Sequence, residues 1–579
     1  MLQVLQYQKT GEIKVEELPE PVCPENGILV KNYYSLISAG TERASVEKAQ
    51  SSLLTRIKKQ PDDVKLVLDF LKKEGIKSTL RRVQSKLDSY KSLGYSTSGI
   101  VVESSVAEFL PGDRVACAGA GYALHAEYIA VPKNLAVHIP DNVSFEDAAF
   151  TTLCSIAMQG IRQTEPQLGD NVAVIGLGLI GLITVQLLKA NGANVLGIDL
   201  NEDLFPLAEK LGCDRTVKSS EGTLEAARAF SNGMLCDSVI ITAATQSNHP
   251  IESALAMTRK KGKIVIVGDV GMNIPRGPFY TKEIDLKISC SYGPGRYDPS
   301  YEENGNDYPY PYVRWTENRN MQSVLQLVST GRLDLKAITT HIFSLEEATK
   351  AYDLITGKIN EKYLGILLKY NEKSERLKSI TLKESKPQGN ISIGFIGLGT
   401  FAQNHLLPHI QRAGVHLSGV ANQSPSSSKT SADKFGFDFY ASDFKELIND
   451  KRTNTIFCAS RHDSHFSAVM DSIKADKPIF VEKPLCVELD QLNKIIETAK
   501  DNDPRIMCGF NRRFSKSFRT IKDFYRGRNY PLTMIYRVNA GFIPLESWIQ
   551  QPNQGGRIIG ECCHFIDTMV YMTDSLPVK

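Results

Sequence analysis

The sequence predicts an α/β protein with two doubly wound units, each built on a parallel sheet. Two observations predict this class. A strand, a glycine-rich turn and a helix follow one another twice, in Val172–Asp199 and in Ile391–Ser424, and further short apolar runs follow each copy. The length of 579 residues allows roughly three to five domains of ~100–200 residues each.

The first copy begins with the apolar run Val172–Ile175, which is typical of a buried parallel strand. Gly176, Gly178 and Gly181 follow in the spacing G-x-G-x-x-G. The first glycine allows a tight turn, the second lets a pyrophosphate approach the backbone, and the third lets helix and strand pack closely. The next strand ends at Asp199, where a carboxylate would hold a ribose 2′-hydroxyl. We therefore predict an NAD(H) site.

The second copy has Gly397, Gly399 and Ala402 in the same spacing, with alanine as an accepted variant at the third place. Its second strand leads to Asn422 and Ser424, without an acid that would reject a 2′-phosphate. Asn422 could serve a ribose hydroxyl and Ser424 a phosphate, so we expect either NAD(H) or NADP(H). The alternative for each copy is a mononucleotide fold that has lost its ligand.

The amino-acid composition of the chain excludes several classes of protein. Hydrophobic residues make up 42% of the chain and charged residues 23%, as in ordinary globular proteins. A net charge of +3 argues against nucleic acid as the main partner. The eleven cysteines lack paired metal-ligand spacing, which suggests reduced thiols in the cytoplasm. The N-terminus alternates like a strand and lacks a signal-peptide core. We expect a homo-oligomer that does not insert into membranes.

The first third of the chain mixes strands and helices. Short alternating segments predict strands over residues 1–45, with a turn at Gly40-Thr41-Glu42. Residues 43–92 have apolar side chains at helical spacing and basic ones opposite, which predicts solvated helices. Strands are expected again over Gly94–Val102 and Arg114–Pro132.

The middle of the chain predicts the first nucleotide unit and its connections. A helix over Phe145–Gln163 leads into it, and Ser238–Ala243 and Lys263–Gly268 predict two further buried strands. Residues 291–315 are irregular and rich in Tyr, Pro and Gly, which is typical of a lid or binding loop. The polar segment 371–389 predicts an interdomain linker.

The last part of the chain predicts the start of another domain. Arg505–Phe510 and Leu532–Val538 have strand patterns, and residues 556–573 predict a buried helix.

The first 370 residues resemble medium-chain, alcohol-dehydrogenase-type reductases. The resemblance rests on PGDRVACAGAGYALHAEYIAVP, AAFTTLCSIAMQGIRQ, the first glycine motif and THIFSLEEATKAYDLITGKINEKYLGILLKY. It implies a GroES-like N-terminal domain over residues 1–150, completed by about 315–370, and a first Rossmann domain over 151–314.

The positions at which zinc-dependent members of that family bind their metal differ here. They hold Ser38 and Tyr95, and only Cys154 lies near a ligand position. Because a catalytic zinc needs about three protein ligands, we expect no zinc in this half. Tyr95 or His125 could act as acid or base, and both could equally be packing residues. We place Tyr95 among the candidate substrate contacts.

Residues 390–579 resemble the Gfo/Idh/MocA oxidoreductase family. The matching motifs are GFIGLGTFAQNH, CASRHDSHFSAVMDSIKADKPIFVEKPL, CGFNRRFS and GECCHFID. The resemblance implies a second Rossmann domain over 390–505, and the start of an α/β substrate domain over 506–579. Members of the family continue well past the last motif, so we expect that Lys579 ends a shortened domain.

The resemblance assigns roles to several residues. Lys483 would contact the reacting hydroxyl and His564 would accept its proton. The family usually has an aspartate four residues before this histidine; the chain has Gly560 there and Glu561 next to it. We keep Glu561 as the candidate carboxylate partner. Further implied contacts are His465, Glu482 and Pro484 to the cofactor, and Asn511, Arg512 and Arg513 to the substrate.

Physical chemistry supports the two catalytic roles independently. Oxidation of a secondary alcohol transfers a hydride to nicotinamide and releases a proton from oxygen. A histidine titrates in the right range for that proton, and a lysine stabilises developing alkoxide character.

We therefore predict an NAD(P)-dependent oxidoreductase with two dehydrogenase modules. It would act on a ring hydroxyl or keto group of a sugar or nucleotide sugar. The order of the modules resembles two-domain oxidoreductases of bacterial surface-polysaccharide gene clusters. Two alternatives remain: a non-catalytic dinucleotide sensor or scaffold, and chemistry carried by the first module.

Overall fold

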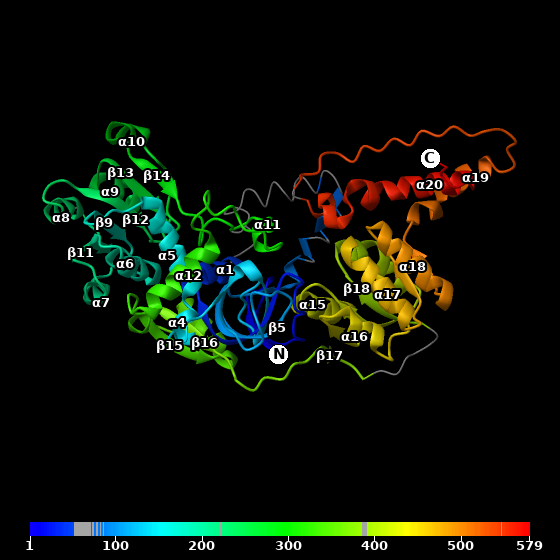
Figure 1. Cartoon of the computed structure of the whole chain (residues 1–579), viewed down its shortest axis with the longest axis horizontal. Helices are drawn as coiled ribbons and strands as arrows, with labels where there is room; N and C mark the ends of the chain where they lie inside the picture. Colours follow the sequence, from blue (N-terminus) through cyan, green and yellow to red (C-terminus); the bar gives the residue numbers. More distant parts are fainter. Residues whose placement is uncertain are drawn as a thin grey trace. The chain divides into compact units, whose positions relative to one another are not determined.

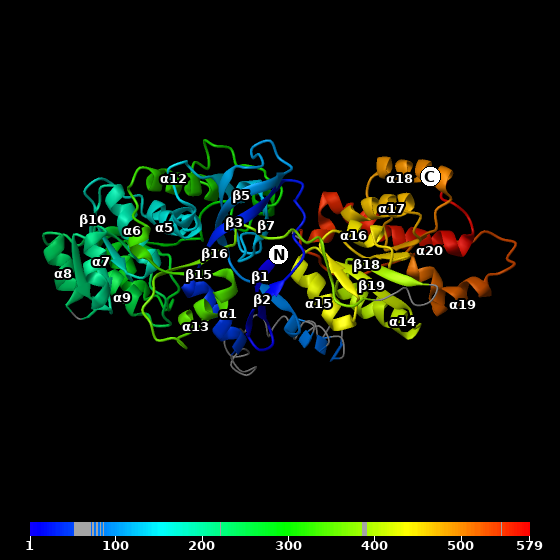
Figure 2. The same cartoon turned by 90° about the horizontal axis from the view of Figure 1, so that it is seen from below.

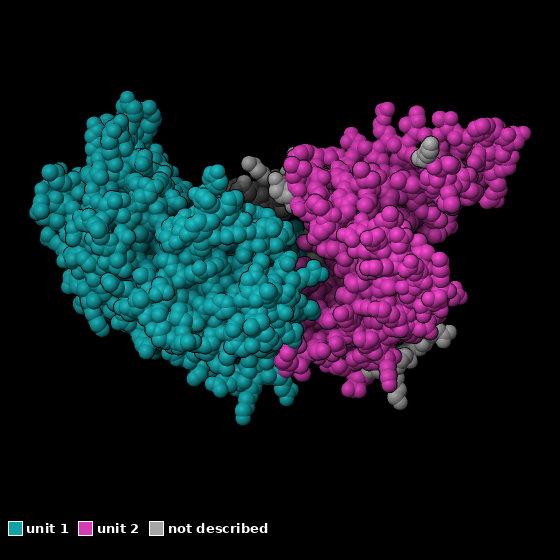
Figure 3. Space-filling model, in the orientation of Figure 1, with its two compact units in different colours: residues 1–17, 21–375 teal, residues 18–20, 376–579 magenta. Residues whose placement is uncertain are grey.

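The computed structural model describes residues 1–50, 71, 75–76, 79–80, 83–84, 86–220, 222–384, 391–545 and 547–578. The chain forms two compact units, coloured separately in Figure 3. The first comprises Met1–Glu17 with Pro21–Glu375, and the second comprises Leu18–Glu20 with Arg376–Lys579. None of the helices in the described ranges combines the length and apolar character that a membrane crossing requires.

The N-terminal part of the first unit is a mostly antiparallel β structure. A three-stranded sheet has the order β2(Ile13–Glu17), β1(Leu2–Tyr7), β4(Tyr90–Ser92). The larger sheet has the order β15(Thr339–Ser344), β16(Gly365–Lys369), β3(Gly27–Ile37), β5(Ser96–Ser104), β6(Arg114–Ala118), β8(Ala136–His138), and β7(Tyr128–Pro132) also pairs with β3. Strand β16 returns from far along the chain to lie antiparallel to β3, with Leu367 opposite Leu36.

One expectation for this region is wrong, and a second is wrong only at its end, because the described residues of 43–92 are helical up to Leu87. Gly40-Thr41-Glu42 is not a turn between strands, because it lies in the first turn of α1(Ala39–Gln50). The Glu42 carboxylate accepts the backbone N–H of Ser38 at 2.9 Å and so satisfies a donor at the start of this helix. The predicted helical span 43–92 ends in β4, where Ser92 pairs with Leu5. The part of that span over 51–70 lies outside the described residues.

The rest of the first unit contains a six-stranded parallel sheet. Its order is β11(Arg215–Lys218), β10(Asn194–Asp199), β9(Asn171–Ile175), β12(Cys236–Ile241), β13(Thr258–Ile266), β14(Asp285–Ile288). In sequence this is the order 3-2-1-4-5-6 of a dinucleotide-binding fold. The strand order changes direction between β9 and β12, because β10 and β11 extend the sheet on one side of β9 and β12 to β14 extend it on the other. Ligands are therefore expected at the carboxyl ends of β9 and β12.

Helices cover both faces of this sheet. Val172 and Val174 pack in one apolar cluster with α5(Thr151–Thr164) and α6(Leu179–Ala190), whereas Ala173 and Ile175 pack in another with α8(Thr223–Phe230) and α9(His249–Met257). Figure 1 shows these helices near β9 and β12, and Figure 2 shows the same four helices from below. Burial on both faces explains why the strands are continuously apolar. Other helices of the unit are α4(Phe145–Ala148), α7(Phe205–Lys210), α10(Arg276–Lys282) and α13(Ala348–Ile355).

The irregular segment 291–315 is firmly packed. It contains α11(Pro299–Glu302) and precedes α12(Glu317–Ser329). Tyr301 and Tyr308 stack with ring centroids 5.2 Å apart, and the Arg162 guanidinium lies 3.4 Å from the ring centroid of Trp315. The tyrosine stacking holds two parts of the segment together, and the arginine contact attaches the segment to α5. The lid or binding loop that composition suggests stays a prediction.

The second unit contains a seven-stranded sheet. Its order is β17(Ser379–Thr381), β20(Phe439–Ala441), β19(His416–Ala421), β18(Ser392–Ile396), β21(Thr455–Cys458), β22(Ile479–Val481), β23(Ile506–Cys508). Six of these strands repeat the order 3-2-1-4-5-6. Strand β17 lies within the predicted linker 371–389 and pairs antiparallel with β20, and the boundary between the two compact units, after Glu375, also lies within this segment. The helices are α14(Leu407–Arg412), α15(Pro425–Phe435), α16(Phe444–Asn449), α17(His465–Lys474) and α18(Leu489–Asn502).

The end of the chain is largely helical. It contains the 3₁₀ turn η7(Asn511–Phe514), α19(Lys516–Phe524), the π-helical turn η10(Ile558–Cys562) and α20(Cys563–Thr573). Residues 532–538 do not form the predicted strand. Their alternation supplies two faces, but no neighbouring strand of the described residues pairs with them, and Ile535 is 87% exposed.

Candidate functional site

The first glycine motif has the geometry of a phosphate-binding turn. Gly176 has φ +98°, and a Cβ there would lie 2.7 Å from the backbone nitrogen of Ala243. Gly181 lies so close to the Gly176 carbonyl that a side chain could not fit. Apart from its neighbours in the chain, no atom of the described residues lies within 4 Å of a Cβ built at Gly178, the residue before α6. The turn is therefore tight on the protein side and open where a pyrophosphate would approach.

The turn of the second motif is likewise tight on the protein side and open on the other side. Gly397 has φ +76° and packs against the backbone of Ser460, whereas a Cβ at Gly399 would meet no atom within 4 Å. Ala402 is buried and begins a π-helical turn, Ala402–Leu406, before α14. Pro408 in the next turn cannot donate a backbone hydrogen bond, which disfavours regular α-helix just before it.

Asp199 and Asn422 occupy matching positions in the two sheets. Asp199 ends β10 and accepts the backbone N–H of Leu177 at 2.6 Å; Asn422 follows β19 and accepts that of Leu398 at 2.7 Å. Ser424 caps α15 by accepting from the N–H of Ser427 at 3.3 Å, so its hydroxyl is already partly used.

Ser38 and Tyr95, which stand where zinc-dependent relatives have metal ligands, are hydrogen-bonded to each other. The Tyr95 hydroxyl donates to Ser38 Oγ at 2.6 Å, and burial raises the pKa of Tyr95. Cys154 is buried, and burial raises the pKa of its thiol. Within the described ranges, no group of three or more His, Cys, Asp or Glu could hold a metal. These residues do not fit a catalytic zinc, which needs about three protein ligands.

His125 has no room for a substrate. Its side chain is fully buried between Glu42, 3.2 Å from Nε2, and Ser35, 2.7 Å from Nδ1. The Tyr352 hydroxyl donates to the same Glu42 carboxylate, and Ser35 also bonds the Tyr370 hydroxyl. The histidine is therefore part of a buried polar network that joins β3, α1 and α13.

Glu482 and Lys483 lie directly after β22, at the carboxyl edge of the second sheet. Glu482 is buried, its Oε1 has no partner among the described residues, and burial raises its pKa. A Cβ at Gly509 would lie 2.9 Å from the Glu482 carboxyl carbon, so glycine is the residue that fits there. The Lys483 ammonium donates to the Gly560 carbonyl at 2.8 Å.

His564 lies at the start of α20, one turn after Gly560. Its ring meets Phe510 edge-on with centroids 6.0 Å apart. Its Nδ1 is buried and has no hydrogen-bond partner among the described residues. Burial, reinforced by the nearby charges of Lys483 and Arg512, lowers the pKa of His564 to about 4. The imidazole is thus neutral at physiological pH and lies close to Lys483.

The structure explains the glycine at position 560. A Cβ there would lie 2.9 Å from Cε1 of His462, whose ring is held by the Gln554 carbonyl at 2.9 Å. The family's aspartate therefore has no space in this chain. Glu561 does not replace it, because its carboxylate pairs with Arg557 at 2.5 Å.

The three candidate substrate residues of η7 differ in their surroundings. Asn511 is exposed. Arg513 pairs with Asp567 of α20, so its charge is matched within the protein. Arg512 donates to the Tyr536 hydroxyl at 2.8 Å and lies over the ring of Phe565.

His465 braces the loop after β22. Its Nδ1 lies 2.7 Å from the Pro484 carbonyl and its Nε2 lies 3.3 Å from the Ser460 carbonyl, and the ring is fully buried. It therefore positions the Glu-Lys-Pro segment rather than presenting a free nitrogen to the cofactor.

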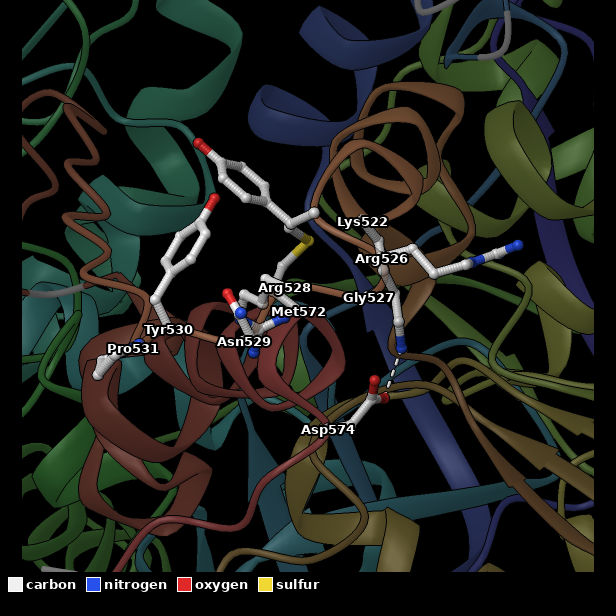
Figure 4. Close-up of a pocket in the computed structure, with 10 residues that line it drawn as sticks. Lys522, Arg526, Gly527, Arg528, Asn529, Tyr530, Pro531, Met572 and Asp574 are labelled. Carbon is white, nitrogen blue, oxygen red and sulfur yellow. Dashed lines mark hydrogen bonds and ion pairs between the residues drawn. The ribbon is translucent and has the colours of Figure 1, made fainter.

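A pocket of about 520 Å³ lies elsewhere in the second unit, after α19 (Figure 4). None of its lining residues is a predicted site residue. Its lysine, Lys522, is paired with Asp574 at 2.5 Å, so that charge is neutralised.

Sequence reasoning missed the residues that support the site from a distance. His462, Asp567 and Tyr536 contact Gly560, Arg513 and Arg512, respectively. Only Asp567 carried a signal, because it stands one turn after His564 in an apolar helix.

Comparisons with known families match each unit separately. Residues 180–303 match the family described as zinc-binding dehydrogenase. Residues 391–510 match the oxidoreductase family with an NAD-binding Rossmann fold.

Individual relatives resemble part of the chain. An uncharacterised zinc-type alcohol dehydrogenase-like protein of Escherichia coli is 24% identical over 308 residues, which is 48% of this chain and 81% of that protein. Sorbitol dehydrogenase of Bacillus subtilis is 27% identical over 297 residues, 45% of this chain and 76% of that enzyme. Among solved structures, an alcohol dehydrogenase from Thermus sp. ATN1 covers 64% of this chain and 100% of its own, at 20% identity and a TM-score of 0.49.

Proposed function

Because this chain is an oxidoreductase that joins a zinc-binding-dehydrogenase segment to an NAD-binding oxidoreductase segment, we propose that it oxidises or reduces a CH–OH group of a sugar with NAD(P). We assign the chemistry to the second unit, with Lys483 and His564 as its catalytic residues.

One observation carries the assignment. Lys483 reaches across to the Gly560 carbonyl at 2.8 Å and is close enough to His564 to lower its pKa. A cation and a neutral imidazole thus meet at the carboxyl edge of β22, where a doubly wound fold binds its ligands. The Nδ1 atom of His564 is buried and has no partner among the described residues, so the protein itself does not use the hydrogen-bonding capacity of this nitrogen.

These groups suit proton transfer from a hydroxyl. A lysine ammonium has three donors, and Gly560 uses one of them. A second can bind the substrate oxygen and stabilise its developing negative charge. The neutral imidazole of His564 accepts the proton. A bound nicotinamide supplies the hydride acceptor, and the open side of Gly399 leaves room for its pyrophosphate.

We propose that the first unit binds NAD(H) without a catalytic zinc. The hydrogen bond between Tyr95 and Ser38 supports this, because it fills the two positions from which zinc ligands would come. Without zinc, this unit lacks an evident group to polarise an alcohol, so we expect it to contribute a second redox step or cofactor binding alone.

The substrate class is part of the proposal. The name of one relative, sorbitol dehydrogenase, points to polyols and sugars. We propose a sugar or nucleotide sugar, in surface-polysaccharide synthesis by analogy with the order of the two modules. The competing hypotheses are a dinucleotide sensor without turnover, and catalysis by the first unit.

Two matched variants separate these hypotheses. Gly178→Asp and Gly399→Asp each place a carboxylate where phosphates would approach, in space that no protein atom occupies. Hydride exchange is measured in the full chain as transfer of deuterium from the carbinol carbon of labelled sugars to NAD(P)⁺. We expect Gly399→Asp to abolish exchange and Gly178→Asp to leave sugar oxidation largely intact.

The reverse pattern would assign catalysis to the first unit. No exchange in the unmodified chain, with cofactor binding retained, would favour the sensor. Circular dichroism of both variants checks that the fold is kept.

A further inference from the structure

Arg512 lies beside the proposed base. It belongs to η7, which follows β23, next to the strand that leads to Lys483. Its Nη1 donates to the Tyr536 hydroxyl at 2.8 Å, and its guanidinium carbon lies 4.9 Å from the ring centroid of Phe565, the residue after His564. One hydrogen bond and one aromatic face thus hold the guanidinium near His564, while several of its five N–H donors remain unused.

Arg513 is paired with a carboxylate of the protein, whereas its neighbour Arg512 is not paired with one among the described residues. Arg513 forms a two-point ion pair with Asp567, whose side chain is 8% exposed. No carboxylate of the described residues lies within ion-pair distance of Arg512. A partly buried arginine usually finds an anion, so this one has capacity for a charge from outside the protein.

The site as a whole carries excess positive charge. Lys483 and Arg512 both act on His564 by lowering its pKa, and Asp567 is the one carboxylate that opposes them. Asp567 is already shared with Arg513. Burial raises the pKa of Glu482. Oxidised nicotinamide would add a further positive charge.

We propose that Arg512 binds an anionic group of the substrate, a carboxylate or a phosphate, beside the hydroxyl that is oxidised. The second unit would then act on acidic sugars or sugar phosphates in preference to neutral polyols. This inference rests on the proposed function, since it concerns the substrate of the same site. An anion at Arg512 would also restore charge balance around His564 and make the imidazole a stronger base.

Binding experiments on the full, NADH-loaded chain test the inference. The experiments use the Gly178→Asp variant, so that NADH binds to the second site alone. The probes are glucuronate, its neutral amide glucuronamide, glucose and glucose 1-phosphate. We expect glucuronate or glucose 1-phosphate to bind at least tenfold more tightly than glucose, and glucuronate more tightly than glucuronamide. The glucuronate and glucose 1-phosphate arms distinguish a carboxylate from a phosphate as the anion.

Variants at Arg512 supply the control. Arg512→Gln should remove the preference, and Arg512→Lys should retain part of it because it keeps the charge but not the planar fork. Arg519→Gln, at an exposed arginine of α19, should change nothing. NMR titration of histidine-labelled protein gives a second readout: glucuronate should raise the pKa of His564 in the parent and leave it unchanged in Arg512→Gln, which a purely structural role of Arg512 would not produce.

The inference is overturned if glucose and glucuronamide bind as tightly as the charged probes, if no probe binds, or if Arg512→Gln leaves the preference intact. Failure of the proposed function is distinguishable, because it would appear as loss of hydride exchange in Gly178→Asp or its survival in Gly399→Asp.

Discussion

Asp199 accepts the backbone N–H of Leu177 through Oδ2 at 2.6 Å. In the second unit, Asn422 makes the matching contact with Leu398 at 2.7 Å. The two side chains differ by one charge but occupy the same place after the second strand of the sheet. The chain therefore allows a direct comparison of an acidic and a neutral residue at the position where dinucleotide-binding folds generally hold the cofactor ribose.

We predict that the first site prefers NAD(H) and that Asp199→Asn weakens the preference. The carboxylate would repel a 2′-phosphate, and asparagine keeps the bond to Leu177. The change should be at least about tenfold, or ~1.4 kcal/mol. Titration of NADH and NADPH in the Gly399→Asp background measures it. Tighter binding of NADPH than of NADH to the parent would contradict the prediction.

The second site should discriminate weakly, with a slight preference for NAD(H). Ser424 is engaged as a helix cap, so a 2′-phosphate has little dedicated support. Asn422→Asp should increase the preference for NAD(H), as judged by the same titrations in the Gly178→Asp background. A preference above roughly a hundredfold in the parent, about 2.7 kcal/mol, would reveal a determinant that this account lacks.

We predict that the first unit holds no stoichiometric zinc. Ser38 and Tyr95 bind each other, and Cys154 alone cannot retain the metal. Elemental analysis of the untagged chain after equilibration with zinc and gel filtration is the test. One tightly held zinc per chain that disappears in Cys154→Ser would refute this prediction, whereas retention after that substitution would indicate a site elsewhere.

Glu317 should make stability depend on pH. It begins α12, is fully buried, and neither carboxylate oxygen has a partner among the described residues. Burial, with a contribution from Glu302, raises its pKa from 4.5 to about 9. Between these values the folded chain keeps a proton that the unfolded chain releases, so the free energy of unfolding falls as pH rises.

Glu317→Gln should remove that slope. Thermal unfolding midpoints at pH 6 and pH 8.5 would differ less in the variant than in the parent, with the larger gain at pH 8.5. Glu346→Gln, at an exposed glutamate, is the control. An unchanged slope in Glu317→Gln would show that this carboxyl is ionised in the folded chain.

The sequence was sufficient to predict the structural features that are formed by residues close together in the chain. Strand, glycines, helix and terminal polar residue lie within about thirty positions, and backbone sterics fix the role of each glycine. Contacts between distant segments could not be predicted. His462, in the 3₁₀ turn before α17, fills the space beside Gly560 of η10, and Asp567 of α20 neutralises Arg513 of η7. Alternation over 532–538 was also insufficient, since a strand needs a partner.

The central claim is that Lys483 and His564 carry out the oxidation. We predict that Lys483→Met and His564→Ala each abolish sugar oxidation in the full chain while NAD(P)H affinity stays nearly unchanged. Loss of the base alone should lower the rate by about 10²–10⁴. The double variant should be little worse than either single one, because both residues act on one oxygen.

Steady-state turnover of these three variants beside Tyr95→Phe is the most direct measurement. The account predicts near-complete loss in the first three and a small effect of Tyr95→Phe. Near-parental turnover in Lys483→Met and His564→Ala, together with loss in Tyr95→Phe, would contradict it and assign the chemistry to the first unit.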